Sequence, residues 1–248
     1  MYKRQFNNFL KFRASWGRVG NDRLKDENGN DIRFPYLTTL GNVSSTWGTG
    51  LAENRTGSMN LKWEVSTKTN FGIDARFFDD KVDMTVDFFH TKTTDIFQRR
   101  ANIPDEGGLS NVLPYANIGS MKSWGMDGTL AYTHTFNKDM ALTVRGNFTH
   151  AENEVIYWEQ SGVNYPYQSN SGVPYKVQRG LIALGLFKDE DDIKSSPKQT
   201  FMDNYRPGDI KYKDVNGDGK IDKDDVVPLN YSAVPFIQYG FALDWNYK

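Results

Sequence analysis

The sequence predicts an all-β protein, namely an antiparallel up-and-down transmembrane β-barrel segment of about six spanning strands with long extracellular loops. Three observations predict this fold class. Long stretches alternate between apolar and polar residues with a period of two. The connections between these stretches are alternately long and very short. Aromatic residues make up 14% of the chain, and most of them are Tyr and Phe, which favour pleated sheets.

The clearest pattern is a hairpin within residues 61–89. Its first arm, residues 61–77, places apolar side chains on one parity and charged or amide side chains on the other. The second arm resumes the alternation at Val82 and fades near Phe97. Only Asp79 and Asp80 join the arms, so we expect Phe77 opposite Val82 and the apolar sides of both arms on one face.

Residues 120–152 repeat this hairpin pattern. Here Asn137, Lys138 and Asp139 form a predicted three-residue loop, which places Phe136 opposite Met140. Residues 8–16 and 236–248 add two further strands with the same alternation. Together with the two hairpins they make six long strands.

The regions between the strands are predicted loops, covering residues 21–58, 99–117 and 153–234. In a meander, alternate connections lie at the same end of the sheet, so the tight turns fall at one end and the long loops at the other. Outer-membrane barrels have this asymmetry, with an apolar outer face toward lipid and a polar lumen. A soluble sandwich is the alternative, but its strands are usually about 5–6 residues long. Since such barrels need at least about 8 strands, we expect the chain to be part of a larger barrel.

Composition excludes several function classes. The chain has 248 residues, 38% of them hydrophobic, and a formal net charge of −1 with no basic run, so no nucleic-acid partner is expected. It has no cysteine, which excludes disulfides and thiolate metal sites. No apolar run is long enough for a membrane helix. The first residues are not followed by an apolar stretch, so we expect no signal peptide there.

The sharpest local motif is the acidic segment at residues 214–225, which reads DVNGDGKIDKDD. Its spacing is that of an EF-hand-like calcium loop, in which alternating carboxylate and amide side chains surround a glycine turn. The alternative is an acidic, glycine-rich turn filled with water. If Ca²⁺ binds, a structural role that orders the long loop is favoured over catalysis. The predicted metal ligands are Asp214, Asn216, Asp218, the carbonyl of Lys220, Asp222 and Asp225.

No catalytic constellation is found, so the sequence does not predict an enzyme. His90, His134 and His150 lie singly on the apolar parity of predicted strands and are interpreted as interface residues. Four aromatic residues in the long loop are candidates for stacking against sugar or peptide, with loop packing and interfacial anchoring as the alternative. They are Trp158, Tyr165, Tyr167 and Tyr175.

Several motifs in order resemble the C-terminal part of the barrel in SusC/RagA-type TonB-dependent outer-membrane transporters. The resemblance covers nearly the whole chain. It is weakest after the acidic loop, where this chain has Val226 and Val227 in place of the acid and arginine frequent in the family. The motifs are FLKFRASWG at 9–17, NLKWE at 60–64, NIGS at 117–120 followed by WGM at 124–126, and PGDIKY at 207–212 running into the acidic loop.

The resemblance implies that residues 1–248 are one partial TonB-dependent receptor β-barrel domain, without plug domain or signal peptide, from a barrel of about 22 strands. Residues 153–234 would be a long extracellular loop that contains the calcium-like loop at 214–225. The implied function is part of an outer-membrane nutrient importer that takes up glycans or peptides. The implied partners are a SusD-like surface lipoprotein, TonB acting through an N-terminal part that this chain lacks, and outer-membrane lipid. The alternative is a soluble secreted β-domain that binds carbohydrate with a calcium-ordered loop.

Overall fold

The computed structural model describes residues 7–25, 29–46, 48–103 and 112–247. The chain forms two compact units. The first, Met1–Glu159 with Pro235–Lys248, is called the sheet unit here, and the second, Gln160–Val234, is called the loop unit. Within the described residues, no helix has the length and apolar character to cross a membrane.

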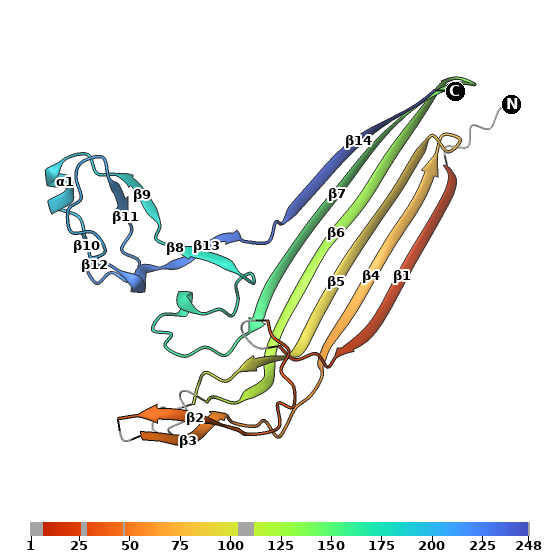
Figure 1. The fold of residues 1–248 in the computed structure, drawn as a ribbon. Coiled ribbons are helices and arrows are strands. Elements are labelled where there is room, and N and C mark those ends of the chain that lie inside the picture. Colours follow the sequence, from red (N-terminus) through yellow and green to blue (C-terminus); the bar gives the residue numbers. More distant parts are fainter. Residues whose placement is uncertain (1–6, 26–28, 47, 104–111, 248) are drawn as a thin grey trace. The chain divides into compact units, whose positions relative to one another are not determined.

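Six long antiparallel strands make up the main sheet of the sheet unit (Figure 1). Their spatial order, β1-β4-β5-β6-β7-β14, follows the chain, which confirms the up-and-down arrangement expected from the sequence. The sheet remains open and does not close into a barrel. The strands are β1 (Asn7–Asn21), β4 (Glu64–Phe77), β5 (Val82–Arg99), β6 (Tyr115–Asn137), β7 (Met140–Tyr157) and β14 (Ile237–Tyr247).

The two tight turns lie at the same end of the sheet, as predicted (Figure 1). In the β4–β5 turn Phe77 pairs with Val82, so the predicted register is confirmed. Asp79 and Asp80 have φ angles of 57° and 62°, the left-handed conformation that short hairpin turns require. Aspartate tolerates this conformation better than most residues.

The β6–β7 turn differs from the prediction. Asn137, and not Phe136, pairs with Met140, and the register shifts between Thr135 and Asn137. Asn137 Oδ1 accepts a 3.0 Å hydrogen bond from the backbone N–H of Asp139, which closes the turn locally. The predicted three-residue loop was therefore wrong, because a β-bulge takes up one residue just before the turn.

The two faces of the sheet have opposite character. Large apolar side chains on one parity are exposed instead of packed in a core, with exposures of 61% for Phe12, 69% for Trp16 and 83% for Phe241. On the other face the guanidinium of Arg13 in β1 bridges two carboxylates. It lies 2.9 Å from Asp74 Oδ2 in β4 and 2.7 Å from Asp87 Oδ2 in β5. A residue with a side chain in place of Gly72 would displace this group, since its Cβ would lie 2.7 Å from the Arg13 guanidinium carbon.

Asn117 of the NIGS motif and Glu64 of the NLKWE motif hold a bulge in β5, at the end away from the tight β4–β5 turn. Asp95 has a φ of 55°, and the β5–β6 register shifts between Thr93 and Ile96. The amide of Asn117 donates to the Asp95 carbonyl at 2.9 Å, and its oxygen accepts from the backbone N–H of Lys62 at 2.8 Å. Glu64 Oε1 accepts from the N–H of Phe97 at 3.0 Å. These side chains satisfy backbone groups that the bulge takes out of the ladder.

The predicted loop at residues 21–58 was partly wrong, because it contains a hairpin of β2 (Thr39–Ser45) and β3 (Gly48–Arg55). The boundaries of two other loops also shift. β6 begins at Tyr115, inside the predicted loop 99–117, and β7 continues to Tyr157, past residue 153.

The loop unit consists of short elements around a small core. Phe187, Ile221 and Val227 are buried in it. Three two-stranded sheets are formed by β8 (Val177–Gly180) with β13 (Val227–Ser232), β9 (Ala183–Leu186) with β11 (Ile210–Tyr212), and β10 (Lys198–Gln199) with β12 (Lys220–Ile221). Short helices are α1 (Glu190–Lys194) and the 3-10 turns η2 (Pro166–Gln168) and η3 (Lys223–Asp225).

Candidate functional site

The acidic loop at residues 214–225 folds through hydrogen bonds from its own backbone. Asp214 accepts from the N–H groups of Gly217 at 2.7 Å and Gly219 at 2.8 Å. Both glycines have positive φ angles, 78° and 83°, which most other residues avoid. Asp218 accepts from Lys220 N–H at 2.8 Å in the same manner. The alternation of short polar residues and glycines therefore produces a series of tight side-chain-capped turns.

Asp225 closes this loop from its buried end. Its side chain is fully buried, and Oδ1 accepts from the N–H of Val215 at 2.7 Å. Oδ2 accepts from the N–H of Asp222 at 2.9 Å, and Asp222 caps η3 by accepting from Asp224 N–H at 2.8 Å. A buried carboxylate is stable when such donors satisfy it. Asp225 thus joins the two ends of the loop.

The predicted calcium ligands are neighbours in this loop, and their carboxylate, amide and carbonyl oxygens are the donors that Ca²⁺ prefers. Among the residues the structure describes, however, no group of three or more His, Cys, Asp or Glu side chains is arranged to hold a metal ion. Asn216 Oδ1 accepts from Asp218 N–H at 3.0 Å, and Asp225 uses both of its oxygens for backbone groups. The loop has the donor chemistry of a calcium loop, and calcium binding stays a prediction.

Two of the predicted aromatic residues form a pair that is bonded to the acidic loop. The rings of Tyr165 and Tyr167 are stacked, with centroids 5.3 Å apart and planes 7° from parallel. The Tyr167 hydroxyl donates to the carbonyl of Asp224 at 2.6 Å, and the Tyr165 hydroxyl accepts from Asn216 Nδ2 at 3.2 Å. Burial is the largest cause that raises the pKa of Tyr167, and the nearby Tyr165 and acidic residues raise it further. The hydroxyl therefore remains a donor across the neutral range.

The four predicted aromatic residues are divided between the two units. Trp158 belongs to the sheet unit, whereas the three tyrosines belong to the loop unit. Tyr175 is 41% exposed, and the ammonium of Lys176 lies 5.6 Å from its ring centroid. Within the described part of the loop unit, the predicted stacking pair is therefore Tyr165 and Tyr167.

A polar pocket of about 320 Å³ lies beside η2 and η3. Its amide side chains are held by the backbone: Gln160 Oε1 accepts from Asn170 N–H at 3.0 Å, and Gln168 Oε1 accepts from Asn164 N–H at 3.1 Å. The lining residues are Gln160, Gly162, Asn164, Gln168, Asn170, Arg179, Lys223, Asp224 and Val226. We did not expect this pocket from the sequence, although the density of amide residues between positions 160 and 170 is a signal for it.

Charged groups complete the pocket. Arg179 donates to the carbonyl of Tyr167 at 3.0 Å and to Asn170 Oδ1 at 3.3 Å, so its guanidinium is fixed in place. Asp224 Oδ1 accepts from Gln168 Nε2 at 3.4 Å. Lys223 is exposed, and its ammonium makes no ion pair within the described chain. The pocket therefore offers fixed acceptors, amide donors and one unpaired cation to a polar ligand.

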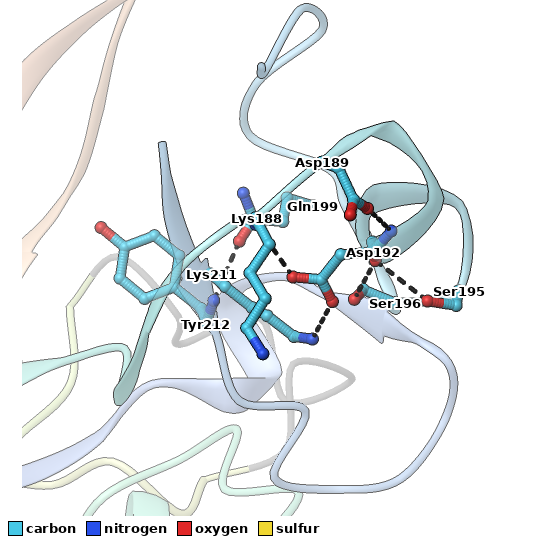
Figure 2. A network of polar contacts seen from close by, with 8 residues as sticks. All are labelled: Lys188, Asp189, Asp192, Ser195, Ser196, Gln199, Lys211 and Tyr212. Carbon is cyan, nitrogen blue, oxygen red and sulfur yellow. Dashed lines mark hydrogen bonds and ion pairs between the residues drawn. The ribbon is translucent and has the colours of Figure 1, made fainter. Parts of the chain in front are cut away.

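A second polar network, centred on Asp192, lies around α1 (Figure 2). Asp192 Oδ1 accepts from Lys211 Nζ at 2.7 Å, and Oδ2 accepts from the N–H of Lys188 at 3.1 Å. Both bonds lower the pKa of Asp192, and the bond from Lys211 has the larger effect. Asp189 caps α1 by accepting from Asp192 N–H at 2.8 Å. The network fixes a short helix that would not be stable alone.

Comparisons with known proteins identify the fold. The family model described as TonB dependent receptor-like, beta-barrel, matches residues 1–246. The chain belongs to the TonB-dependent receptor β-barrel family. It is 31% identical to the TonB-dependent receptor P39 of Formosa agariphila, over 98% of this chain and 26% of that protein. It is 25% identical to the TonB-dependent receptor SusC of Bacteroides thetaiotaomicron, over 87% of this chain and 21% of that protein.

Solved structures agree on the fold. The RagAB peptide importer in its open-open state matches with a TM-score of 0.69 and 23% identity, over 98% of this chain and 25% of that chain. The chain therefore spans about a quarter of the length of the relatives it matches.

Membership of this receptor family explains the two faces of the sheet. TonB-dependent receptor barrels lie in the outer membrane, so the exposed apolar face of the six strands borders lipid and the polar face borders the lumen. The unclosed sheet is consistent with a section of a larger barrel wall. The family consists of receptors and not of enzymes, in agreement with the predicted lack of a catalytic site.

Proposed function

We propose that this chain forms part of the wall of an outer-membrane importer that takes up glycans or peptides with energy supplied through TonB. The observation that carries the proposal is the two-faced sheet of a TonB-dependent receptor barrel, with its tight turns at one end and its long loops at the other. Hydrophilic nutrients can pass through a polar lumen, whereas they do not enter the apolar surface that faces lipid. The alternative of a soluble secreted β-domain gives no reason for the exposed apolar face.

In this proposal the loop unit contacts the substrate at the outer surface. The stacked pair of Tyr165 and Tyr167 offers an apolar face with fixed hydroxyls, and the pocket beside it offers amides and charges. This combination suits a hydroxyl-rich saccharide better than an apolar side chain, because amides hydrogen-bond hydroxyl groups in both directions. RagAB is named as a peptide importer, so a peptide substrate is the competing outcome.

A surface lipoprotein of the SusD type is the proposed partner. The support is the similarity of the chain to the TonB-dependent receptor SusC. The test is co-purification: the complete receptor extracted from outer membranes in mild detergent should bring down one lipoprotein in equal amount. A receptor that is isolated alone, at full recovery, would contradict this part of the proposal.

The acidic loop is proposed to bind Ca²⁺ as a structural ion through Asp214, Asn216, Asp218, Lys220, Asp222 and Asp225. Calorimetric titration of the full chain with CaCl₂ tests it, with Asp218→Ala as the variant. We expect heat from the wild type and little or none from the variant, because Asp218 supplies one of the predicted side-chain oxygens. Equal heats, or none from either protein, would remove the ion.

Transport itself is tested in cells that produce the complete receptor. Uptake of a fluorescent oligosaccharide panel is compared with uptake of a fluorescent peptide panel, each with and without tonB. We expect TonB-dependent uptake of at least one saccharide. Uptake of neither panel would contradict the importer proposal. Uptake of peptides alone would contradict the saccharide assignment and identify the receptor as a peptide importer.

The role of the loop pocket is tested by binding in the same receptor. Asn164→Ala removes a lining amide whose side chain makes no hydrogen bond within the described chain, so the change should leave the loop intact. Loss of one hydrogen bond to the ligand should weaken saccharide binding by about ten-fold. Lys198→Ala, an exposed position of the loop unit outside the pocket, is the control. Unchanged affinity in Asn164→Ala would contradict the pocket assignment.

A further inference from the structure

The lipid-facing side of the sheet unit contains an apolar groove of about 340 Å³ across β5, β6 and β7. Two glycines on neighbouring strands, Gly128 and Gly146, form its floor, and the larger side chains of Met84, Met126, Leu130 and Phe148 surround them. Asp127, Thr129 and Asn147 also border the groove, but strand alternation places their side chains on the opposite face of β6 and β7. The groove lies on three adjacent inner strands of the sheet, whose register is continuous here.

The missing side chains of the glycines produce this groove. Gly128 pairs with Phe148, and Leu130 pairs with Gly146, so each glycine faces a large residue on the next strand. Gly146 has no backbone reason to be glycine. Its φ is not positive, and a Cβ there would meet nothing closer than the Gly240 carbonyl oxygen at 3.9 Å. Glycine weakens a strand because it has no side chain to pack. At Gly146 the result of this missing side chain is the open space of the groove.

The groove lies midway between aromatic side chains of β6. Along β6 the same parity carries Trp124 before the groove and Tyr132 and Phe136 after it. At the usual rise and tilt of a membrane strand, Trp124 to Phe136 spans about 30 Å across the membrane. This matches the apolar band of about 25 Å between the aromatic girdles of such barrels. The groove is therefore at the depth of the acyl chains and away from the headgroups.

We propose that this groove binds one acyl chain of an outer-membrane lipid. It is continuous with the face that borders lipid, and its lining side chains are apolar. Methionines such as Met84 and Met126 adapt to an irregular flexible chain. A peptide strand would not fit, because its backbone groups would need partners in hydrocarbon, whereas the N–H and C=O groups of β5, β6 and β7 are already paired with each other.

Tryptophan quenching by a brominated lipid tests the proposal. The full chain, purified in detergent, is titrated with phosphatidylcholine brominated in mid-chain. Phe148→Trp places a reporter in the groove, and Phe71→Trp places one on the same face of β4, outside it. The fluorescence of the parent chain is subtracted, since it has six tryptophans. We expect the groove reporter to be quenched at a several-fold lower lipid fraction than the control reporter.

Filling the groove supplies the second measurement. Gly146→Leu has room for its Cβ and should remove the difference between the two reporters. Native mass spectrometry of chains without reporters should show a retained lipid that Gly146→Leu loses. Equal quenching curves for both reporters would overturn the proposal, as would lipid retention unchanged by Gly146→Leu. A groove reporter protected from lipid by a second copy of the chain, seen as a cross-linked dimer, would also overturn it.

Discussion

The hydroxyl of Tyr167 donates a 2.6 Å hydrogen bond to the backbone carbonyl of Asp224, which connects η2 to the end of the acidic loop. Asp224 also lines the polar pocket, and its carboxylate accepts from Gln168 Nε2. The aromatic pair, the pocket and the acidic loop are therefore one structural assembly. A change in one of them is expected to affect the others.

Tyr167→Phe tests this connection. The variant keeps the ring and its stacking on Tyr165 but loses the hydroxyl, which leaves a partly buried carbonyl without its donor. We expect the loop unit to lose about 1 kcal/mol of stability. Hydrogen exchange of the backbone amides in residues 214–226 measures it. The control, Tyr36→Phe, removes an exposed hydroxyl that has no hydrogen-bond partner among the described residues. It should not change the exchange of residues 214–226. Equal exchange in both variants would show that the hydroxyl does not hold the loop.

Asp225→Asn tests the closure of the acidic loop. An amide in place of the carboxylate turns an NH₂ group toward a backbone N–H, at Val215 or at Asp222, and leaves that donor unsatisfied in a buried site. The expected destabilisation of the loop unit is about 1–3 kcal/mol. Limited proteolysis should then cut within residues 214–225. The control is Asp203→Asn, at an exposed position, and a cleavage pattern shared with this control would contradict the closing role of Asp225.

Gly125→Ala tests the close approach of β6 and β7. A Cβ at Gly125 would clash with the carbonyl oxygen of His150 and would lie 2.9 Å from the Cα of Ala151. The clash is with backbone, so the strands have to separate, and we expect a loss of about 1–3 kcal/mol. Gly17→Ala is the matched control, since a Cβ there meets nothing within 4 Å. Urea unfolding in detergent should separate the two variants, and equal midpoints would refute the packing argument.

The sequence could predict the spanning strands because their alternation extends over many residues. The pairing of Phe77 with Val82 followed from alternation and a short turn alone. The pairing of Asn137 with Met140 did not, because a bulge changes the count without changing the pattern around it. The β2–β3 hairpin was missed because its segment, rich in Gly, Ser, Thr and Asn, has the composition of a loop.

The candidate site was only partly predictable, for a different reason. The acidic loop is local, so its turns follow from its own sequence. The pocket depends on contacts between residues that are apart in the sequence. Arg179 contacts Asn170, and Tyr167 contacts Asp224, which lies 57 positions away from it. The strands of the loop unit that produce these contacts have two to six residues, too few for a periodic signal.

We expect Asp192 to make the loop unit sensitive to acid. The hydrogen bonds from Lys211 and Lys188 lower its pKa below the usual value of 3.8, because both favour the ionised carboxylate. A carboxyl whose pKa is lowered by folding stabilises the fold above its unfolded pKa, and this contribution is lost as the pH falls through the folded pKa. We therefore expect the amide proton of Lys188, followed by isotope-edited NMR, to titrate at a pH below the normal aspartate range.

Asp192→Asn should abolish this titration and loosen α1 at neutral pH, because an amide forms weaker bonds with Lys211. Asp191→Asn is the control one residue away. The side chain of Asp191 is 92% exposed and pairs only with Lys194 among the described residues, at 3.3 Å, so its loss should change little. A Lys188 titration that persists in Asp192→Asn, or that disappears in Asp191→Asn, would assign the acid sensitivity to another group.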